Sequence, residues 1–312
     1  MKNYKVVYPL IDERYYETPA EPEYECSDII QSALDEMGAN GGGAVALERG
    51  AYFIKKTLRV PKNVTLCGVS ENGTQIYQHD ANGREWNLIE CEDGATVRDL
   101  RINVRGTHKC IIEGKNGLCV ERISVVASPY FKFTTVSGEN MDGAIMINAV
   151  GDNITVKDCE MLGIGRGIVV KDSRNVTVDS VCIYTSGKGI DLLGCEGVSA
   201  TLCTLRGKTQ KANDKEACGV KPTADCSVVI DGCKDVCMSE IGIHDIRINP
   251  SAVFVTDSEN VEINNLLAEI VEYAVVARNS KNVKICGVDA VRCKGVDADG
   301  ATVEDVRVLV NY

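Results

Sequence analysis

The segment SRNVTVDSVCIYTSGKGIDLLG, residues 173 to 194, contains two short runs in which apolar and polar residues alternate. Val176 and Val178 form the first run, and Val181 and Ile183 form the second after a two-residue corner. Alternation with a period of two is typical of a β-strand that buries one face. The segment therefore predicts two short strands joined by a bend.

The same spacing of four apolar positions fits the chain ten times, which indicates an internal repeat. The first of these positions is occupied in turn by Val64, Ala95, Leu118, Ile154, Val176, Val198, Val236, Val261, Val283 and Ala301. In the regular repeats a third strand, such as GIVV at residue 167 or GIDL at residue 189, begins nine residues earlier. Three short strands in each repeat of about 22 residues predict an all-β fold, a parallel β-helix of about ten coils. Asparagines are expected at the corner before the first position, at Asn63, Asn153, Asn175, Asn260 and Asn282.

Residues 28 to 37 are expected to form a helix that covers the N-terminal end of the stack, because an open end exposes apolar side chains and unpaired strand edges. Ser27 or Asp28 is the expected N-cap. The apolar stripe of this helix consists of Ile29, Ile30, Ala33, Leu34 and Met37. We therefore expect one β-helix domain over residues 1–312, with residues 1–50 as the N-terminal segment and cap and residues 51–312 as the coils.

The chain carries a net charge of −11 and contains 15 cysteines. The negative charge argues against nucleic acid and anionic membranes as partners, since both attract clustered Lys and Arg. The cysteines lack paired metal-ligand spacing, so we expect reduced and mostly buried thiols. The start of the sequence has no apolar signal-peptide run and no stretch is long enough to span a membrane, which predicts a cytoplasmic location.

The run SDIIQSALDEMGANGGGAVALERGAYFIKKTLRVPKNVTLCGVSENGTQI, residues 27 to 76, resembles the N-terminal module of the pectate-lyase-like superfamily. This resemblance implies a single-stranded right-handed parallel β-helix with an N-terminal capping helix. The superfamily includes polysaccharide lyases, glycoside hydrolases, sugar transferases, epimerases and phage tailspikes. The segment NMDGAIMI, residues 140 to 147, resembles the N-T-D-G segment of polygalacturonases, which implies that Asp142 is a catalytic aspartate. In the next coil Gly165 and Arg166 replace the paired aspartates of that family, which argues against its standard mechanism.

Two long insertions, residues 127–141 and 206–224, interrupt the repeat on the same side and are expected to form the walls of a groove. The turns before the leading strands in this region form a charged ladder on five successive coils: His108, Asp142, Arg166, Lys188 and Asp225. The candidate catalytic residues are Lys188, Arg166 and Asp142. The candidate substrate-binding residues are Asp225, His108, Asp191, Asp231 and Tyr130.

This ladder favours β-elimination at a uronic acid, which requires a cation to neutralise the substrate carboxylate and a base to remove the adjacent proton. Arg166 would supply the cation, and Lys188 on the next coil would supply the base. The neighbouring guanidinium would favour the neutral form of the lysine amine. A calcium ion bound by Asp142 and Asp225 is an open alternative, and no other cofactor is expected.

Two other function classes stay open. A glycoside hydrolase or transglycosylase needs two carboxylates ~5–9.5 Å apart, whereas Asp142 and Asp225 would be three coils, or ~14 Å, apart. Such an enzyme would have to recruit other acids, namely Glu139, Asp191, Asp231, Asp214 or Glu216. A non-catalytic β-helical spike or adhesin would instead use an outer apolar stripe, expected at Met146, Val169, Val229, Phe254 and Val276, which also leaves a homo-oligomer open. In all three classes the expected partner is an oligo- or polysaccharide.

Overall fold

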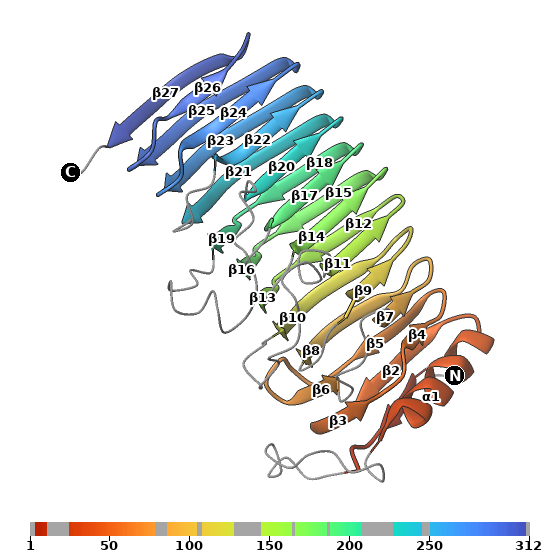
Figure 1. The fold of residues 1–312 in the computed structure, drawn as a ribbon. Helices are drawn as coiled ribbons and strands as arrows, with labels where there is room; N and C mark the ends of the chain where they lie inside the picture. The colour runs from red at the N-terminus through yellow and green to blue at the C-terminus, as the bar shows by residue number, and fades with distance from the viewer. Residues whose placement is uncertain are drawn as a thin grey trace.

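The repeat folds into coils that stack along one axis, with the N-terminal helix at one end and the C-terminal strand at the other (Figure 1). The computed structural model describes residues 4–10, 25–78, 86–104, 108–127, 145–163, 166–185, 188–207, 227–244 and 250–309. Each regular coil contributes one strand to a ten-stranded sheet and a bent arm to a seventeen-stranded sheet. Neighbouring coils pair in parallel, as between β14 (Arg166–Lys171) and β17 (Ile190–Leu193). The predicted all-β parallel coil is confirmed.

The ten-stranded sheet contains the leading strands of successive coils. Its strands are β4 (Leu58–Val60), β7 (Asn87–Cys91), β9 (Cys110–Gly114), β11 (Ile145–Val150), β14, β17, β20 (Val228–Asp231), β22 (Ser251–Thr256), β24 (Tyr273–Arg278) and β26 (Val296–Ala298). This sheet carries the charged residues that are central to the candidate site.

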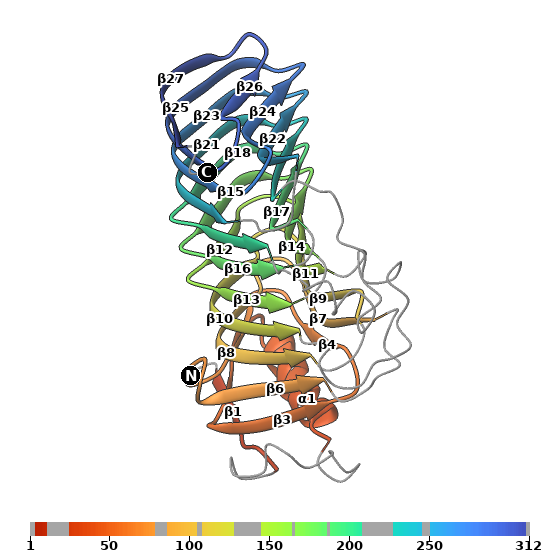
Figure 2. The same cartoon turned by 60° about the vertical axis from the view of Figure 1, so that its left-hand side comes forward.

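The seventeen-stranded sheet forms the rest of the coil wall, and the second arms of β8, β10, β13 and β16 stack one above another in Figure 2. Its strands are β1 (Tyr4–Val7), β2 (Gly43–Leu47), β3 (Gly50–Ile54), β5 (Val64–Cys67), β6 (Thr74–Gln78), β8 (Thr96–Val104), β10 (Cys119–Ala127), β12 (Ile154–Lys157), β13 (Glu160–Gly163), β15 (Arg174–Asp179), β16 (Cys182–Thr185), β18 (Glu196–Thr201), β19 (Thr204–Gly207), β21 (Lys234–His244), β23 (Glu259–Glu269), β25 (Lys281–Val291) and β27 (Thr302–Leu309). β1 pairs with β2 and β2 pairs with β5, so these two strands before residue 51 belong to the same sheet as the coils.

The four predicted apolar columns line the interior of the coil. Val176, Val178, Val181 and Ile183 are all buried, and each contributes roughly 1.5–3 kcal/mol through removal of its side chain from water. The prediction is wrong at Val69, Val303 and Val308, which are exposed. Val69 belongs to the irregular first coil, and the other two lie in β27, the last described strand.

Left-handed backbone conformations turn the chain at the predicted asparagine corner. Asn153 and Asn175 have φ values of 59° and 57°, and the Nδ2 group of Asn175 donates a hydrogen bond of 3.1 Å to Oδ1 of Asn153. The same interaction recurs between Asn282 and Asn260, at 2.8 Å. Asparagine suits this corner because it tolerates positive φ and its side chain bonds to the neighbouring coil.

Replacing Asn175 with alanine is expected to destabilise the fold by about 1 kcal/mol, because a Cβ-bearing residue without a polar side chain is disfavoured at positive φ. Glycine at the same position tolerates positive φ and loses only the hydrogen bond, so its effect should be smaller. Thermal unfolding of both variants tests this difference. An alanine variant that is as stable as the glycine variant would contradict the backbone explanation.

The predicted helix is present as α1 (Ser27–Ala39), and it buries Ile30, Ala33, Leu34 and Met37 against the first coil. Two details of the prediction are wrong. The N-cap is Cys26, which makes no side-chain capping bond. The hydroxyl of Ser27, one of the two expected caps, instead accepts hydrogen bonds from the N–H groups of Lys55 and Lys56, at 3.0 and 3.2 Å. Ile29, which was expected in the buried stripe, is 45% exposed.

All cysteines within the described residues are free thiols, and most are buried. Burial raises the pKa of Cys159 and of Cys203 to about 12, so both are protonated at neutral pH and act as small apolar core residues. Cys237 is the exposed exception. Within the described part of the chain, no helix is long and apolar enough to cross a membrane.

Candidate active site

Two columns of side chains point outward from the ten-stranded sheet. In β14, Ile168 and Val170 belong to the core, whereas Arg166 and Val169 lie on the outer side. The first column contains Asn87, Cys110, Ile145, Arg166 and Lys188. The second contains Glu90, Glu113, Asn148, Val169, Asp191, Val229, Phe254 and Val276. Residues in neighbouring coils of one column are separated by the strand spacing of ~4.8 Å.

Arg166 and Lys188 of the first column form a cationic centre beside Asp191 of the second column. The Nη1 atom of Arg166 lies 3.2 Å from Oδ2 of Asp191, and the Nζ atom of Lys188 lies 3.6 Å from the same oxygen. The Asp191 side chain is 1% exposed, while those of Arg166 and Lys188 are 26% and 25% exposed. One buried carboxylate therefore lies beneath two cations that reach solvent, and the cluster carries one excess positive charge.

This arrangement revises the role expected for Asp191. A side chain that is 1% exposed is a counter-ion beneath the cations rather than a direct contact for a substrate. Its negative charge also offsets the repulsion between Arg166 and Lys188. The other oxygen of Asp191 and the Nε atom of Arg166 are buried and have no hydrogen-bond partner within the described part of the chain, and each such group costs roughly 1–3 kcal/mol.

A cluster of acids and amides lies on the N-terminal side of the cationic centre, in β7, β9 and β11. The Nδ2 group of Asn87 donates hydrogen bonds to both Glu90 and Glu113, and its distance to Oε1 of Glu90 is 3.1 Å. Asn148 donates from Nδ2 to the other oxygen of Glu113, at 3.3 Å. None of these four residues was predicted, because the expected site comprised the turn before each leading strand and these residues lie within the strands or at their start.

The acid and amide cluster carries an excess negative charge. Arg59 forms an ion pair with Glu90, with 3.4 Å between Nε and Oε2, whereas Lys109 forms no ion pair with Glu90 or Glu113. Arg59, Glu90 and Glu113 together carry one excess negative charge. Among the described residues, the side-chain amide oxygens of Asn87 and Asn148 are buried and have no hydrogen-bond partner, so this cluster has unused capacity to accept hydrogen bonds.

The predicted ladder of five charged residues is only partly present. Ile145 is in register with both Cys110 and Arg166, so the coil that follows Asp142 is displaced by two residues from the expected alignment. His108 is buried two residues before Cys110 and does not share the column of Arg166. The difference arises because coils of unequal length were aligned by the turn before the strand.

The remaining predicted site residues lie elsewhere. Asp231 is exposed at the far end of β20, where it is in register with Leu193 and not with Lys188. Met146 is buried in the main core, so the predicted outer apolar stripe is wrong at that position. Several candidate residues lie outside the described residues, as do most of both insertions: Asp142, Asp225, Tyr130, Glu139, Asp214 and Glu216.

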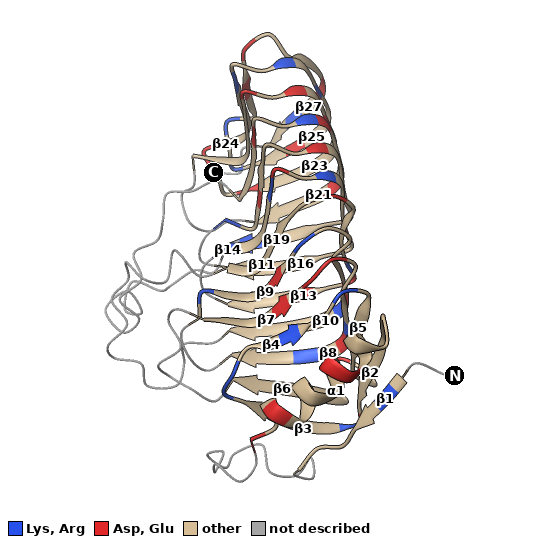
Figure 3. Cartoon of the chain, turned by 90° about the vertical axis from the view of Figure 1, so that its right-hand side faces the viewer, with Lys and Arg blue, Asp and Glu red and all other residues tan. Residues whose placement is uncertain are grey.

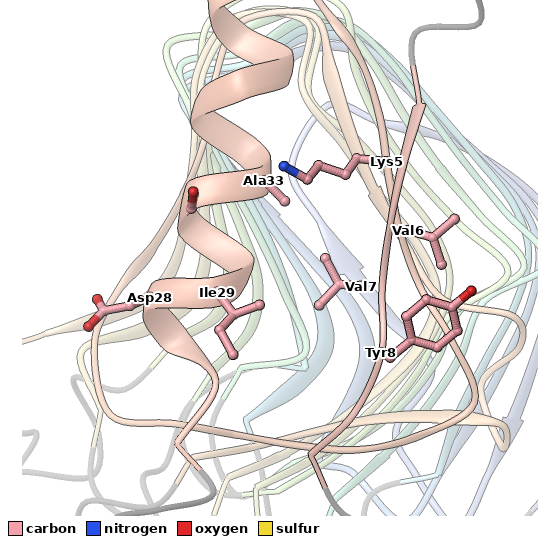
Figure 4. A pocket seen from close by; sticks show the side chains of 8 residues that line it. Lys5, Val6, Val7, Tyr8, Asp28, Ile29 and Ala33 are labelled. Carbon is pink, nitrogen blue, oxygen red and sulfur yellow. The ribbon is translucent and has the colours of Figure 1, made fainter.

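Other features of the described residues do not add to this site. No group of three or more His, Cys, Asp or Glu side chains among them is arranged to hold a metal ion. Charged residues of both signs lie along the outside of the stack (Figure 3). An open cavity of about 540 Å³ lies at the N-terminal cap between α1 and β1, lined by Lys5, Val7 and Ile29 among others (Figure 4). It is far along the stack from the cationic centre.

Solved structures with the same architecture cover nearly the whole chain. The enzymatically active domain of tailspike protein 2 of bacteriophage CBA120 matches with a TM-score of 0.56 and 13% identity over 97% of this chain and 46% of that one. The surface adhesin PfbA of Streptococcus pneumoniae matches with a TM-score of 0.52 and 12% identity over 90% and 89% of the two chains. An alginate lyase of Paenibacillus sp. FPU-7 matches with a TM-score of 0.50 and 11% identity over 92% and 97%.

The fold is a right-handed parallel β-helix. No protein-family model and no curated protein sequence matches the chain. At these identities the similarity establishes the β-helix alone. Any activity therefore has to be argued from the side chains of the two outer columns.

Proposed function

We propose that this β-helix is a carbohydrate-active enzyme that cleaves a uronate-containing glycan by β-elimination. The observation that carries the proposal is the cationic centre, in which Arg166 and Lys188 reach solvent above the buried carboxylate of Asp191. An excess positive charge at an outward-facing site attracts the carboxylate of a uronic acid. The alginate lyase supports the proposal only in that a lyase is built on the same fold.

The different contacts of the two cations suit different roles. Arg166 makes a hydrogen bond to Asp191 that holds its guanidinium in place, so it can bind and neutralise the substrate carboxylate. The 3.6 Å separation between Lys188 and Asp191 is longer than a hydrogen bond, which leaves Nζ free to turn toward a substrate. We assign Arg166 to carboxylate binding, Lys188 to proton removal and Asp191 to positioning both cations.

The elimination step is balanced within the substrate and this lysine. Once the substrate is bound, Lys188 gives one proton to solvent. Its neutral amine then takes the proton from the carbon next to the uronate carboxyl group, and the electron pair left behind forms a carbon–carbon double bond. The glycosidic carbon–oxygen bond on the adjacent carbon breaks, and the departing oxygen takes up a proton. Arg166 stabilises the negative charge that develops on the carboxylate. A catalytic role for Asp142, binding roles for Tyr130 and Asp225, and a cytoplasmic location stay predictions.

Glycoside hydrolysis is the second candidate, because Glu90 and Glu113 lie on adjacent coils and bind the same amide nitrogen. The coil spacing of ~4.8 Å is near the ~5–5.5 Å separation of carboxylates in retaining glycosidases. This candidate would use the acid and amide cluster instead of the cationic centre.

Incubation with a panel of neutral and uronate-containing glycans tests the proposed function. Elimination produces an unsaturated uronate that absorbs in the ultraviolet and also releases a reducing end. Hydrolysis releases reducing ends without that absorbance. That result would indicate that Glu90 and Glu113 are the catalytic residues. Binding of a glycan without any cleavage would instead support a non-catalytic spike or adhesin.

A further inference from the structure

The outer columns differ in chemistry on the two sides of the cationic centre. Toward the N-terminus lie the acid and amide cluster of Asn87, Glu90, Glu113 and Asn148, and toward the C-terminus lie Val229, Phe254 and Val276. Among the described residues of the two columns, the excess positive charge lies at the centre, on Arg166 and Lys188. A ligand extended along the columns would therefore meet one cationic position flanked by an acidic part and an apolar part.

We infer that the site selects a glycan in which uronates are sparse, so that uncharged sugars flank the uronate bound at the cationic centre. This inference rests on the proposed function and specifies its substrate class. One coil spacing of ~4.8 Å is close to the length of one sugar in an extended glycan. With a uronate at Arg166, the sugars next to it lie over Asn148 and Glu113, one and two coils away.

Charge opposes a second uronate over the acid and amide cluster. In a polymer that carries a carboxylate on every sugar, or on every second sugar, a carboxylate would lie close to Glu113, which forms no ion pair with any described Lys or Arg. Like charges at such separations repel by about 1 kcal/mol in a solvent-exposed setting. An uncharged sugar avoids this repulsion, and its hydroxyl groups can donate hydrogen bonds to the carboxylates.

The hydrogen-bonding capacity of the cluster points to the same kind of ligand. The carboxylates of Glu90 and Glu113 only accept hydrogen bonds, and the amide oxygens of Asn87 and Asn148 are acceptors that no described residue bonds to. Asn87 is 6% exposed, so its unsatisfied oxygen is costly in the free protein. Sugar hydroxyls are donors, whereas an ionised carboxylate cannot donate. On the other side, Phe254 and Val276 offer apolar contact to the C–H groups of a sugar.

The decisive experiment compares three soluble glycans: polygalacturonate, with a uronate at every sugar; hyaluronan, at every second sugar; and deacylated gellan, at every fourth. Binding affinity and release of unsaturated uronate are both measured, with chelator present. We expect both to increase as the uronates become sparser. If no glycan yields unsaturated product, the proposed function fails, and the order of binding affinities still decides the inference.

A charge variant tests the cause of the preference. Glu113→Gln keeps a hydrogen-bond acceptor but removes the charge. We expect it to raise the ratio of the binding affinity for polygalacturonate to that for gellan about fivefold. Glu262→Gln, in the exposed Glu262–Lys284 pair on the other sheet, is the control and should leave the ratio unchanged. Strongest binding of polygalacturonate, or an unchanged ratio in Glu113→Gln, would overturn the inference. A preference that switches to polygalacturonate when calcium is added would also overturn it, since the acids would then bind a bridging cation.

Discussion

Lys188→Ala is expected to lower the rate of uronate elimination about a thousandfold while leaving the β-helix folded. The rate falls because the general base is lost, and positioned acid–base groups commonly contribute factors of ~10²–10⁴. The fold persists because Lys188 lies on a solvent-facing turn, and Arg166 remains hydrogen-bonded to Asp191 in the variant. The measurement is initial rate by ultraviolet absorbance, together with a thermal unfolding curve.

Arg166→Ala should reduce elimination to a similar extent through loss of carboxylate binding, with a larger increase in KM than Lys188→Ala shows. Lys281→Ala, at an exposed position in β25, is the matched control and should behave as the unmodified protein. If Glu90→Gln or Glu113→Gln abolishes cleavage while Lys188→Ala retains it, the hydrolytic mechanism is correct and the assignment of Lys188 as base is wrong.

The double variant Arg166→Ala/Lys188→Ala is expected to lose about 3 kcal/mol of unfolding free energy, far more than either single variant. Each single variant leaves one cation beside Asp191, whereas the double variant leaves a carboxylate that is 1% exposed without any counter-ion. An uncompensated buried charge is strongly destabilising. Denaturant unfolding measures the loss.

Addition of Asp191→Asn to the double variant should recover most of the lost stability, because the amide removes the buried charge while preserving the shape of the side chain. The triple variant should remain inactive, which separates the structural role of Asp191 from catalysis. If the double variant is as stable as the single variants, Asp191 does not depend on these two cations.

The fold could be predicted from the sequence because the coil repeats its apolar pattern locally. Val176, Val178, Val181 and Ile183 show the period of two and the corner within eight residues, and the register between coils follows from the repeat itself. The apolar pattern could not predict which side chain caps the N-terminus of α1, because that depends on hydrogen bonds to residues distant in the sequence. Cys26 rather than Ser27 is the N-cap, because the Ser27 hydroxyl is used by the backbone of a loop 28 residues later.

The candidate site was less predictable because it depends on alignment between coils of unequal length. Arg166 and Lys188 were identified correctly as neighbours, since the repeat between them is regular. Glu90 and Glu113 were missed because they lie five residues before their first apolar positions, Ala95 and Leu118, whereas Asp191 lies seven before Val198. A search for polar residues at the fourth leading-strand position of each coil could have found them.

Stacking at a fixed spacing has a consequence for how such a site diverges between related chains. The separation between the acid and amide cluster and the cationic centre is a whole number of coils, and regular coils here repeat every 22 residues, as from Val176 to Val198. Insertion of one complete coil after β11 would move the two parts ~4.8 Å farther apart without altering either set of contacts. Duplication or loss of single coils would therefore change the number of sugars between charged groups one at a time, while the chemistry at each end is inherited intact.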